Sequence, residues 1–300
     1  MQNHWARPYS SCFMQPDAER AIDVIKYGVI TVTAKTRLYQ ALACIVDLNI
    51  SGLPVVDAET RPEGIITEKD LLMLLYEKQS TSGIVETYMN PQVVSFPEET
   101  PLKEICVCLL ENPFRRVPIT KDGKVISVIS RTDLLRANLH KFIAEEEDTS
   151  MAEEETPFPA WQVMNKGLVT VKPDTPLSEA VGMLADYCLS GLPVVDEEMH
   201  LVGMLTEKDV MPYFYVSQEP PDQVFDLMTT EVISFGPDDN MIEICECLIH
   251  NQFRRVPIVK DGVLTGLISR ADVIRYILRN ISRVSHFQAV QVVEKKTTFS

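Results

Sequence analysis

The sequence predicts an α/β fold of the mixed α+β type, built from four units with the element order β-α-β-β-α. The first observation behind this prediction is a long internal repeat. The segment SGLPVVD at 51–57 returns unchanged at 190–196, and FRRVPI at 114–119 returns at 253–258. Both pairs are 139 positions apart, and a fixed-period repeat determines the architecture before any residue is given a chemical role. We therefore expect two similar modules.

A shorter repeat divides each module again. Thr67 and Ser130 are 63 positions apart, and so are Thr206 and Ser269. The first unit most resembles the third and the second most resembles the fourth, which indicates that a pair of units was duplicated whole. The predicted units are 21–80, 84–140, 161–216 and 224–281, with an N-terminal extension at 1–20, an acidic linker at 141–160 and a C-terminal tail at 282–300.

The third unit shows the predicted elements in order. GLVTV at 167–171 is rich in β-branched residues and predicts a strand, and apolar residues at helical spacing follow over 177–187. LPVVD at 192–196 and LVGML at 201–205 predict two more strands joined by a short turn. A second helix begins directly after them, and Pro212 should limit or kink it.

Composition narrows the function. The chain has 28 basic and 43 acidic residues, a formal net charge of −15, and 45% hydrophobic residues. Seven of the acids lie between 145 and 155, which leaves about −8 for the rest of the chain. A broad basic surface for nucleic acid is not expected, whereas a local basic pocket for a small anion is compatible with this charge.

The seven cysteines and the absence of long apolar runs bear on the redox state and the location of the protein. Cys106 and Cys108, like Cys245 and Cys247, lie within apolar helical patterns, where i and i+2 side chains point to different faces. Buried reduced thiols are thus favoured over metal ligation. With no apolar run near 18 residues and no secretory leader pattern, we expect a soluble cytoplasmic protein without membrane contact.

Four S/T-x-x-D boxes mark the starts of the second helices. The pattern is typical of a capping box, in which hydroxyl and carboxylate satisfy free backbone N–H groups. The same geometry could hold a phosphate at a helix N-terminus and a ribose on the carboxylate. Both interpretations remain open on the sequence. The boxes pair Thr67 with Asp70, Ser130 with Asp133, Thr206 with Asp209 and Ser269 with Asp272, and they contain the basic residues Lys69, Arg131, Lys208 and Arg270.

Two arginine pairs precede core strands of the second and fourth units. Arg115-Arg116 and Arg254-Arg255 lead directly into Val-Pro-Ile segments, where they could be solvated or could bind phosphate oxygens. Ser51 and Ser190 occupy the same place in the first and third units, so the two types of unit are not equivalent.

These motifs resemble the CBS domains, named for cystathionine β-synthase. The resemblance covers about 21–281 and rests on the strand motifs above together with GIITEKD, SVISRTD, GMLTEKD and GLISRAD. It implies two tandem Bateman modules in a flat disc, a layout similar to the γ subunit of AMP-activated protein kinase. It also implies that AMP, ADP, ATP or S-adenosylmethionine binds between paired units. Under this resemblance the box aspartates hold the ribose, and the box hydroxyls, the arginine pairs, the basic box residues and Ser51 and Ser190 lie near phosphate.

The chain departs from the family pattern at two positions. Ser127 replaces the glycine found in the other units and could narrow the second cleft. Tyr27 stands where the other units carry Met89, Met164 and Met228, so we expect a different base pocket in the first unit.

The leading hypothesis is a non-catalytic regulatory protein that senses adenine nucleotides and transmits their state to an unidentified effector protein. The five histidines show no metal-binding spacing, and the sequence contains no nucleophile elbow and no P-loop. We therefore expect neither an enzyme nor a catalytic cofactor. The alternative is an interaction scaffold in which the boxes only cap helices and the clefts are empty. The linker could close the disc within one chain, and a homodimer pairing module with module is equally compatible.

Overall fold

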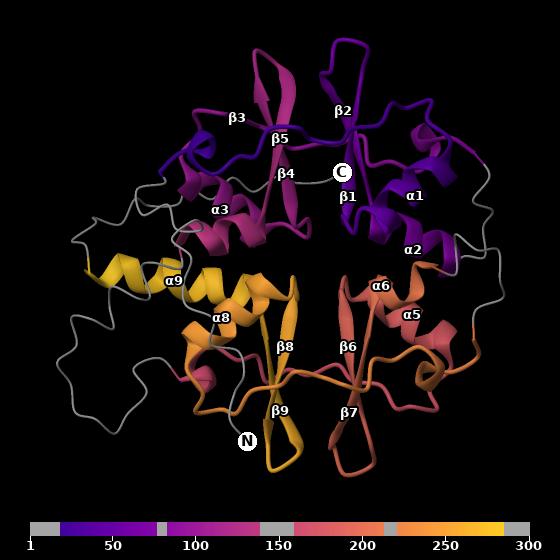
Figure 1. Cartoon of the computed structure of the whole chain (residues 1–300), viewed down its shortest axis with the longest axis vertical. Coiled ribbons are helices and arrows are strands. Elements are labelled where there is room, and N and C mark those ends of the chain that lie inside the picture. The colour runs from indigo at the N-terminus through magenta and orange to yellow at the C-terminus, as the bar shows by residue number, and fades with distance from the viewer. Residues whose placement is uncertain (1–18, 77–82, 139–158, 213–220, 285–300) are drawn as a thin grey trace, which may run out of the picture.

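The chain is described by a computed structural model that covers residues 19–76, 83–138, 159–212 and 221–284. The expected N-terminal extension, acidic linker and C-terminal tail lie almost wholly outside these ranges. The four units are arranged around a common centre, with module 1 above module 2 in Figure 1. Each unit presents an antiparallel hairpin, and helices lie to the outer side of the hairpins.

Module 1 contains the first two units. The hairpin of the first unit has Gly52 opposite Thr67, and that of the second has Arg116 opposite Ser130. A helix follows each hairpin at once, and in the second unit it is described over 131–138. The elements are η1 (Ala21–Asp23), α1 (Leu38–Asp47), β1 (Gly52–Val56), β2 (Pro62–Thr67), α2 (Glu68–Tyr76), η2 (Val85–Thr87), β3 (Phe96–Pro97), α3 (Leu102–Glu111), β4 (Arg116–Lys121) and β5 (Lys124–Ser130).

Module 2 repeats this order. Gly191 lies opposite Thr206 and Arg255 opposite Ser269, the same register as in module 1. The short helix α6 ends before Pro212, as the sequence predicts. The elements are η3 (Ala160–Gln162), α5 (Leu177–Asp186), β6 (Gly191–Val195), β7 (Leu201–Thr206), α6 (Glu207–Val210), η4 (Val224–Asp226), α8 (Met241–His250), β8 (Arg255–Lys260), β9 (Val263–Ser269) and α9 (Arg270–Val284).

The leading strand of each unit is shorter than predicted. In the third unit the segment 167–171 makes one parallel bridge, from Val171 to Val194, instead of a full strand. Only the second unit, among the described residues, forms a named strand here, the two-residue β3 parallel to β4. The β-branched composition correctly indicates extended backbone. However, the segment meets a neighbouring strand on one side and at one bridge, so most of its residues form no ladder hydrogen bonds.

The two modules exchange apolar side chains through their central helices. Leu72 of the first unit packs in the core of the third, and Met211 of the third packs in the core of the first. Leu135 of the second unit lies in the core of the fourth, and Ile274 of the fourth lies in the core of the second. All four side chains are at most 2% exposed. The modules therefore close on each other within one chain, as the central helices show in Figure 1.

A second exchange occurs inside each module. The segment that precedes each unit in the sequence packs against the other unit of its module. Ala21 of the first segment belongs to the core of the second unit, and Val85 belongs to that of the first. In module 2, Ala160 packs on the fourth unit and Val224 on the third. The core of each unit thus includes residues from the leading segment of the other unit in the same module.

No helix within the described ranges is long and apolar enough to cross a membrane. The six cysteines outside the N-terminal extension are free thiols. Cys106 and Cys245 are buried in cores, and burial raises the pKa of Cys245. Cys106 and Cys245 pack as small apolar groups, as predicted, whereas Cys108 and Cys247 are only partly buried.

Candidate functional site

In all four S/T-x-x-D boxes the aspartate makes the predicted contact back to the backbone N–H of the Ser or Thr. In each box the aspartate Oδ2 accepts from the backbone N–H of the Ser or Thr at 2.7–2.9 Å and from its hydroxyl at 2.5–2.7 Å. One carboxylate oxygen is therefore used by the protein in every unit. The boxes lie at the inner ends of the hairpins, directly opposite Gly52, Arg116, Gly191 and Arg255 in the ladders.

The second carboxylate oxygen differs between the units. Oδ1 of Asp272 pairs with Arg275 at 2.9 Å, and Oδ1 of Asp133 pairs with Arg136 at 3.6 Å. Asp70 and Asp209 have no partner for Oδ1 among the residues that the structure describes. Burial raises the pKa of both these aspartates, although hydrogen bonds from their box threonines act in the opposite direction.

The basic residues inside the boxes fall into two kinds. Arg131 donates to the carbonyls that end α3, including Leu109 O at 2.6 Å, and Arg270 donates to Leu248 O at the end of α8. Arginines at helix C-termini satisfy free carbonyls and interact favourably with the helix dipole. In the other kind, Lys69 donates to Cys188 Sγ, whereas Lys208 has no hydrogen-bond or ion-pair partner among the described residues. Burial, followed by repulsion from Arg254, lowers the pKa of Lys208.

Arg116 and Arg255 each join the two units of a module. Arg116 donates to Gly52 O at 3.0 Å and to the Ser51 hydroxyl. Arg255 makes the equivalent contacts, at 2.9 Å to Gly191 O and 3.1 Å to Ser190 Oγ.

Neither guanidinium forms an ion pair with a carboxylate among the described residues. Burial lowers the pKa of both Arg116 and Arg255 to about 10. The buried Nε of Arg255 has no hydrogen-bond partner. A cation withdrawn from water and held only by neutral acceptors leaves positive charge available to an anion.

Arg115 and Arg254 have a different environment from the one the sequence suggests. Arg254 contacts Glu68 of module 1 and Glu207 of its own module, and Arg115 lies 3.0 Å from Glu207 across the module boundary. Both glutamates are at most 3% exposed. Although burial alone lowers it, the two carboxylate charges raise the pKa of Arg254. In this structure these two arginines hold the modules together.

Sequence reasoning missed the glutamates of this cluster. Glu68 and Glu207 are the second residues of the TEKD boxes and are related by the 139-residue repeat, as are their partners Arg115 and Arg254. The only sequence signal for this cluster was that a box glutamate and an arginine pair both recur at the 139-residue period. It could not be used, because the pattern within one unit does not show that the partner lies in the other module.

The departures at Tyr27 and Ser127 concern one place in the molecule. In the other units a methionine sulfur lies against the glycine: a Cβ at Gly203 would approach Met228 Sδ to 2.8 Å. Ser127 instead donates to Lys26 O at 2.7 Å, and the adjacent Tyr27 is 69% exposed. The segment that carries Tyr27 therefore packs against the second unit, and a different base pocket at this place stays a prediction.

The inner ends of the units carry an excess of positive charge. The boxes, the arginine pairs and their ion-pair partners contribute ten basic and six acidic side chains, although the whole chain has a net charge of −15. The local excess favours an anionic ligand at this place. The basic residues are Lys69, Arg115, Arg116, Arg131, Arg136, Lys208, Arg254, Arg255, Arg270 and Arg275, and the acids are Glu68, Asp70, Asp133, Glu207, Asp209 and Asp272.

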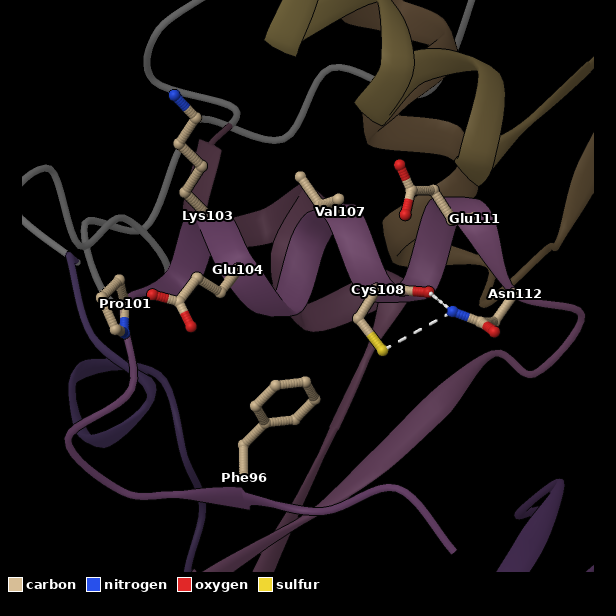
Figure 2. A pocket seen from close by; sticks show the side chains of 8 residues that line it. All are labelled: Phe96, Pro101, Lys103, Glu104, Val107, Cys108, Glu111 and Asn112. Carbon is tan, nitrogen blue, oxygen red and sulfur yellow. Dashed lines mark hydrogen bonds between the residues drawn. The ribbon is translucent and has the colours of Figure 1, made fainter. Parts of the chain in front are cut away.

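Two other features lie apart from the boxes. An open groove of about 580 Å³ runs along α3, and Figure 2 shows Phe96 on one side of this helix and Val107 turned away from it. None of its lining residues is a predicted site residue. The β6–β7 turn brings one potential ligand atom each of Asp196, Glu198 and His200 within 4.8 Å of one another, an arrangement that the histidine spacing did not predict.

The comparisons with known proteins agree with this architecture. A family model of the CBS domain matches residues 21–77, 85–140, 160–215 and 224–279. The uncharacterized protein MJ1225 of Methanocaldococcus jannaschii is 25% identical over 202 residues, which cover 67% of this chain and 72% of that protein. Inosine-5'-monophosphate dehydrogenase of the same organism is 36% identical over 115 residues, which cover 38% of this chain and 22% of the enzyme.

Solved structures show the same fold. The crystal structure of MJ1225, described as a candidate archaeal homolog of g-AMPK, has a TM-score of 0.75 at 21% identity and covers 86% of this chain and 99% of that chain. A conserved protein from Pyrococcus horikoshii has a TM-score of 0.59 at 22% identity with the same coverage. Four matched repeats and a shared two-module architecture lead to one conclusion: this chain belongs to the CBS domain family, with four CBS domains in two tandem Bateman modules.

Proposed function

We propose that this protein is a non-catalytic regulator that binds adenine nucleotides between its paired CBS units. The observation that carries the proposal is the environment of Arg116 and Arg255. Both guanidiniums are part-buried, have only neutral acceptors among the described residues, and belong to residues that lie opposite the box serines in the ladder. A nucleotide phosphate would supply the missing negative charge, and the neighbouring box aspartates would accept hydrogen bonds from the ribose.

Regulation would follow from the position of this site. A ligand held by Arg255 and Ser190 contacts both units of a module, so it can change the angle between them. Such a change requires that the ligand binds the two arrangements with different affinity. We propose that an effector protein, as yet unidentified, responds to this change.

Isothermal titration calorimetry with AMP, ADP, ATP and S-adenosylmethionine tests the proposal. Charge-assisted hydrogen bonds contribute about 1.5–3 kcal/mol each, so Arg255→Ala should weaken binding by about tenfold or more. Lys172→Ala is the control, because Lys172 lies on the surface and pairs with the exposed Glu197. If none of the four ligands binds below about millimolar concentration, where the binding free energy is only about −4 kcal/mol, the proposal fails.

A scaffold without ligand is the second candidate, and the capping geometry favours it. Each box aspartate already accepts two hydrogen bonds from its own Ser or Thr, so structure alone can account for these residues. On this hypothesis Asp209→Asn changes stability by a cap's contribution, about 0.5–2 kcal/mol, and leaves every ligand response unchanged. Denaturation and calorimetry on the same variant separate the two functions.

A further inference from the structure

The four boxes differ in how much of their carboxylate remains available. A carboxylate has about four acceptor positions, two on each oxygen. In every unit the box N–H and hydroxyl occupy Oδ2. The two vicinal hydroxyls of a ribose must therefore use Oδ1. This oxygen has a guanidinium partner at Asp133 and Asp272 and none at Asp70 and Asp209 among the described residues.

One sequence position accounts for this difference. The residue three after the box aspartate is Arg136 in the second unit and Arg275 in the fourth, whereas the first unit has Met73 and the third has Pro212. Residues three apart on a helix lie on the same face, so an arginine at this position reaches the carboxylate and a methionine cannot pair with it.

We infer that Arg136 and Arg275 determine which boxes accept a ribose, so that the units with Asp70 and Asp209 form the tighter class of nucleotide site. The inference rests on the proposed function and deepens it. At the second and fourth boxes the ribose hydroxyls must displace or share the guanidinium. At the first and third boxes they meet a part-buried carboxylate oxygen that has no partner in the described part of the chain, so binding supplies hydrogen bonds without breaking an ion pair.

The two arginines should not be equally effective. Arg275 lies 2.9 Å from Asp272 Oδ1 with hydrogen-bonding geometry, whereas Arg136 lies 3.6 Å from Asp133 Oδ1. Arg275 is also the more exposed of the two, with 42% of its side chain accessible against 24% for Arg136. The shorter contact of Arg275 competes more strongly with the ribose hydroxyls for Oδ1, whereas its greater exposure makes its side chain easier to displace. Both boxes therefore remain able to bind a ribose, at lower affinity than the first and third boxes.

Exchange of the residues between units provides the test. Full-length protein is titrated with AMP by calorimetry. Removing the ion pairs with the double change Arg136→Met and Arg275→Met should tighten the weaker class by about two- to fivefold, the range expected for a partly exposed pair. The reciprocal change Met73→Arg should weaken binding at the first unit by a similar factor. Asp70→Asn with Asp209→Asn should remove the tighter class, and Asp133→Asn with Asp272→Asn the weaker one.

The outcomes separate this inference from the proposed function. If the two Arg→Met changes weaken AMP binding or leave it unchanged, or if the Asp133 and Asp272 variants lose the tighter class, the inference is wrong while nucleotide binding stands. If AMP, ADP and ATP bind none of the proteins, the proposed function fails and the inference fails with it. Melting temperature is measured in parallel, because a general loss of folding would weaken both classes together.

Discussion

The two buried glutamates at the module boundary differ in the number of arginines that they pair with. Glu207 accepts from Arg115 and Arg254, whereas Glu68 contacts only Arg254 among the described residues. Removing one partner of a buried charge network leaves the others without compensation, which costs about 3–5 kcal/mol. We expect Glu207→Ala to lower the free energy of unfolding by about this amount, and by more than Glu68→Ala, because two arginines lose a partner.

Urea denaturation of both variants measures this difference. Glu197→Ala is the matched control, because Glu197 pairs with Lys172 at the surface and its side chain is 75% exposed. That change should leave the unfolding midpoint close to the wild-type value, since exposed ion pairs contribute little. Equal effects of Glu68→Ala and Glu207→Ala would show that Arg115 does not depend on Glu207.

Residue roles could be predicted only as far as they depend on local sequence. The S/T-x-x-D pattern predicts the capping contacts of all four boxes, because donor and acceptor lie three residues apart. The partners of Arg115 and Arg254 could not be predicted in the same way. Glu207 is 92 residues from Arg115, and Glu68 is 186 residues from Arg254. Whether such a pair meets depends on the packing of whole modules.

The bounds of helices and strands were predicted more completely than the units against which they pack. Apolar periodicity predicts α5 and the hairpin β6–β7 close to their observed bounds. It does not indicate that each leading segment packs on the other unit of its module, because both units have the same kind of core. Tyr27 lies within the first matched CBS domain, at 21–77, but its segment packs on the second unit, which the pattern of one unit does not show. The hydrogen bond from Ser127 to Lys26 O places it against the second unit.

The exchange of side chains between central helices gives a prediction at this scale. Leu72 is carried by α2 but is fully buried in the core of the third unit. Leu72→Ala should cost about 2–5 kcal/mol, and the cavity should form in module 2 although the change is made in module 1. Hydrogen exchange should therefore rise in β6, β7 and α5 more than in β1 and β2 of the first unit. Val107→Ala, an exposed change on α3, is the control. A loss of protection confined to the first unit would contradict the exchange.

The arrangement of the whole molecule follows from the pairing of these exchanges. Leu72 with Met211 and Leu135 with Ile274 fill two cores on each side of the module boundary, and Arg254 adds a buried charge contact between them. The surfaces that could pair two chains module to module are thus already covered inside one chain. A second copy would have to break these contacts before it could form equivalent ones, with no net gain in buried apolar area.

We therefore expect the protein to remain a monomer of 33.9 kDa at micromolar concentration. Light scattering coupled to size-exclusion chromatography measures the mass directly, and dilution over a hundredfold range should not change it. Leu72→Asp is the informative variant, because a charge inside the core of the third unit should separate the modules and expose their apolar faces. That variant should associate or aggregate while the wild-type chain does not. A wild-type mass near twice 33.9 kDa would show instead that modules of different chains pair.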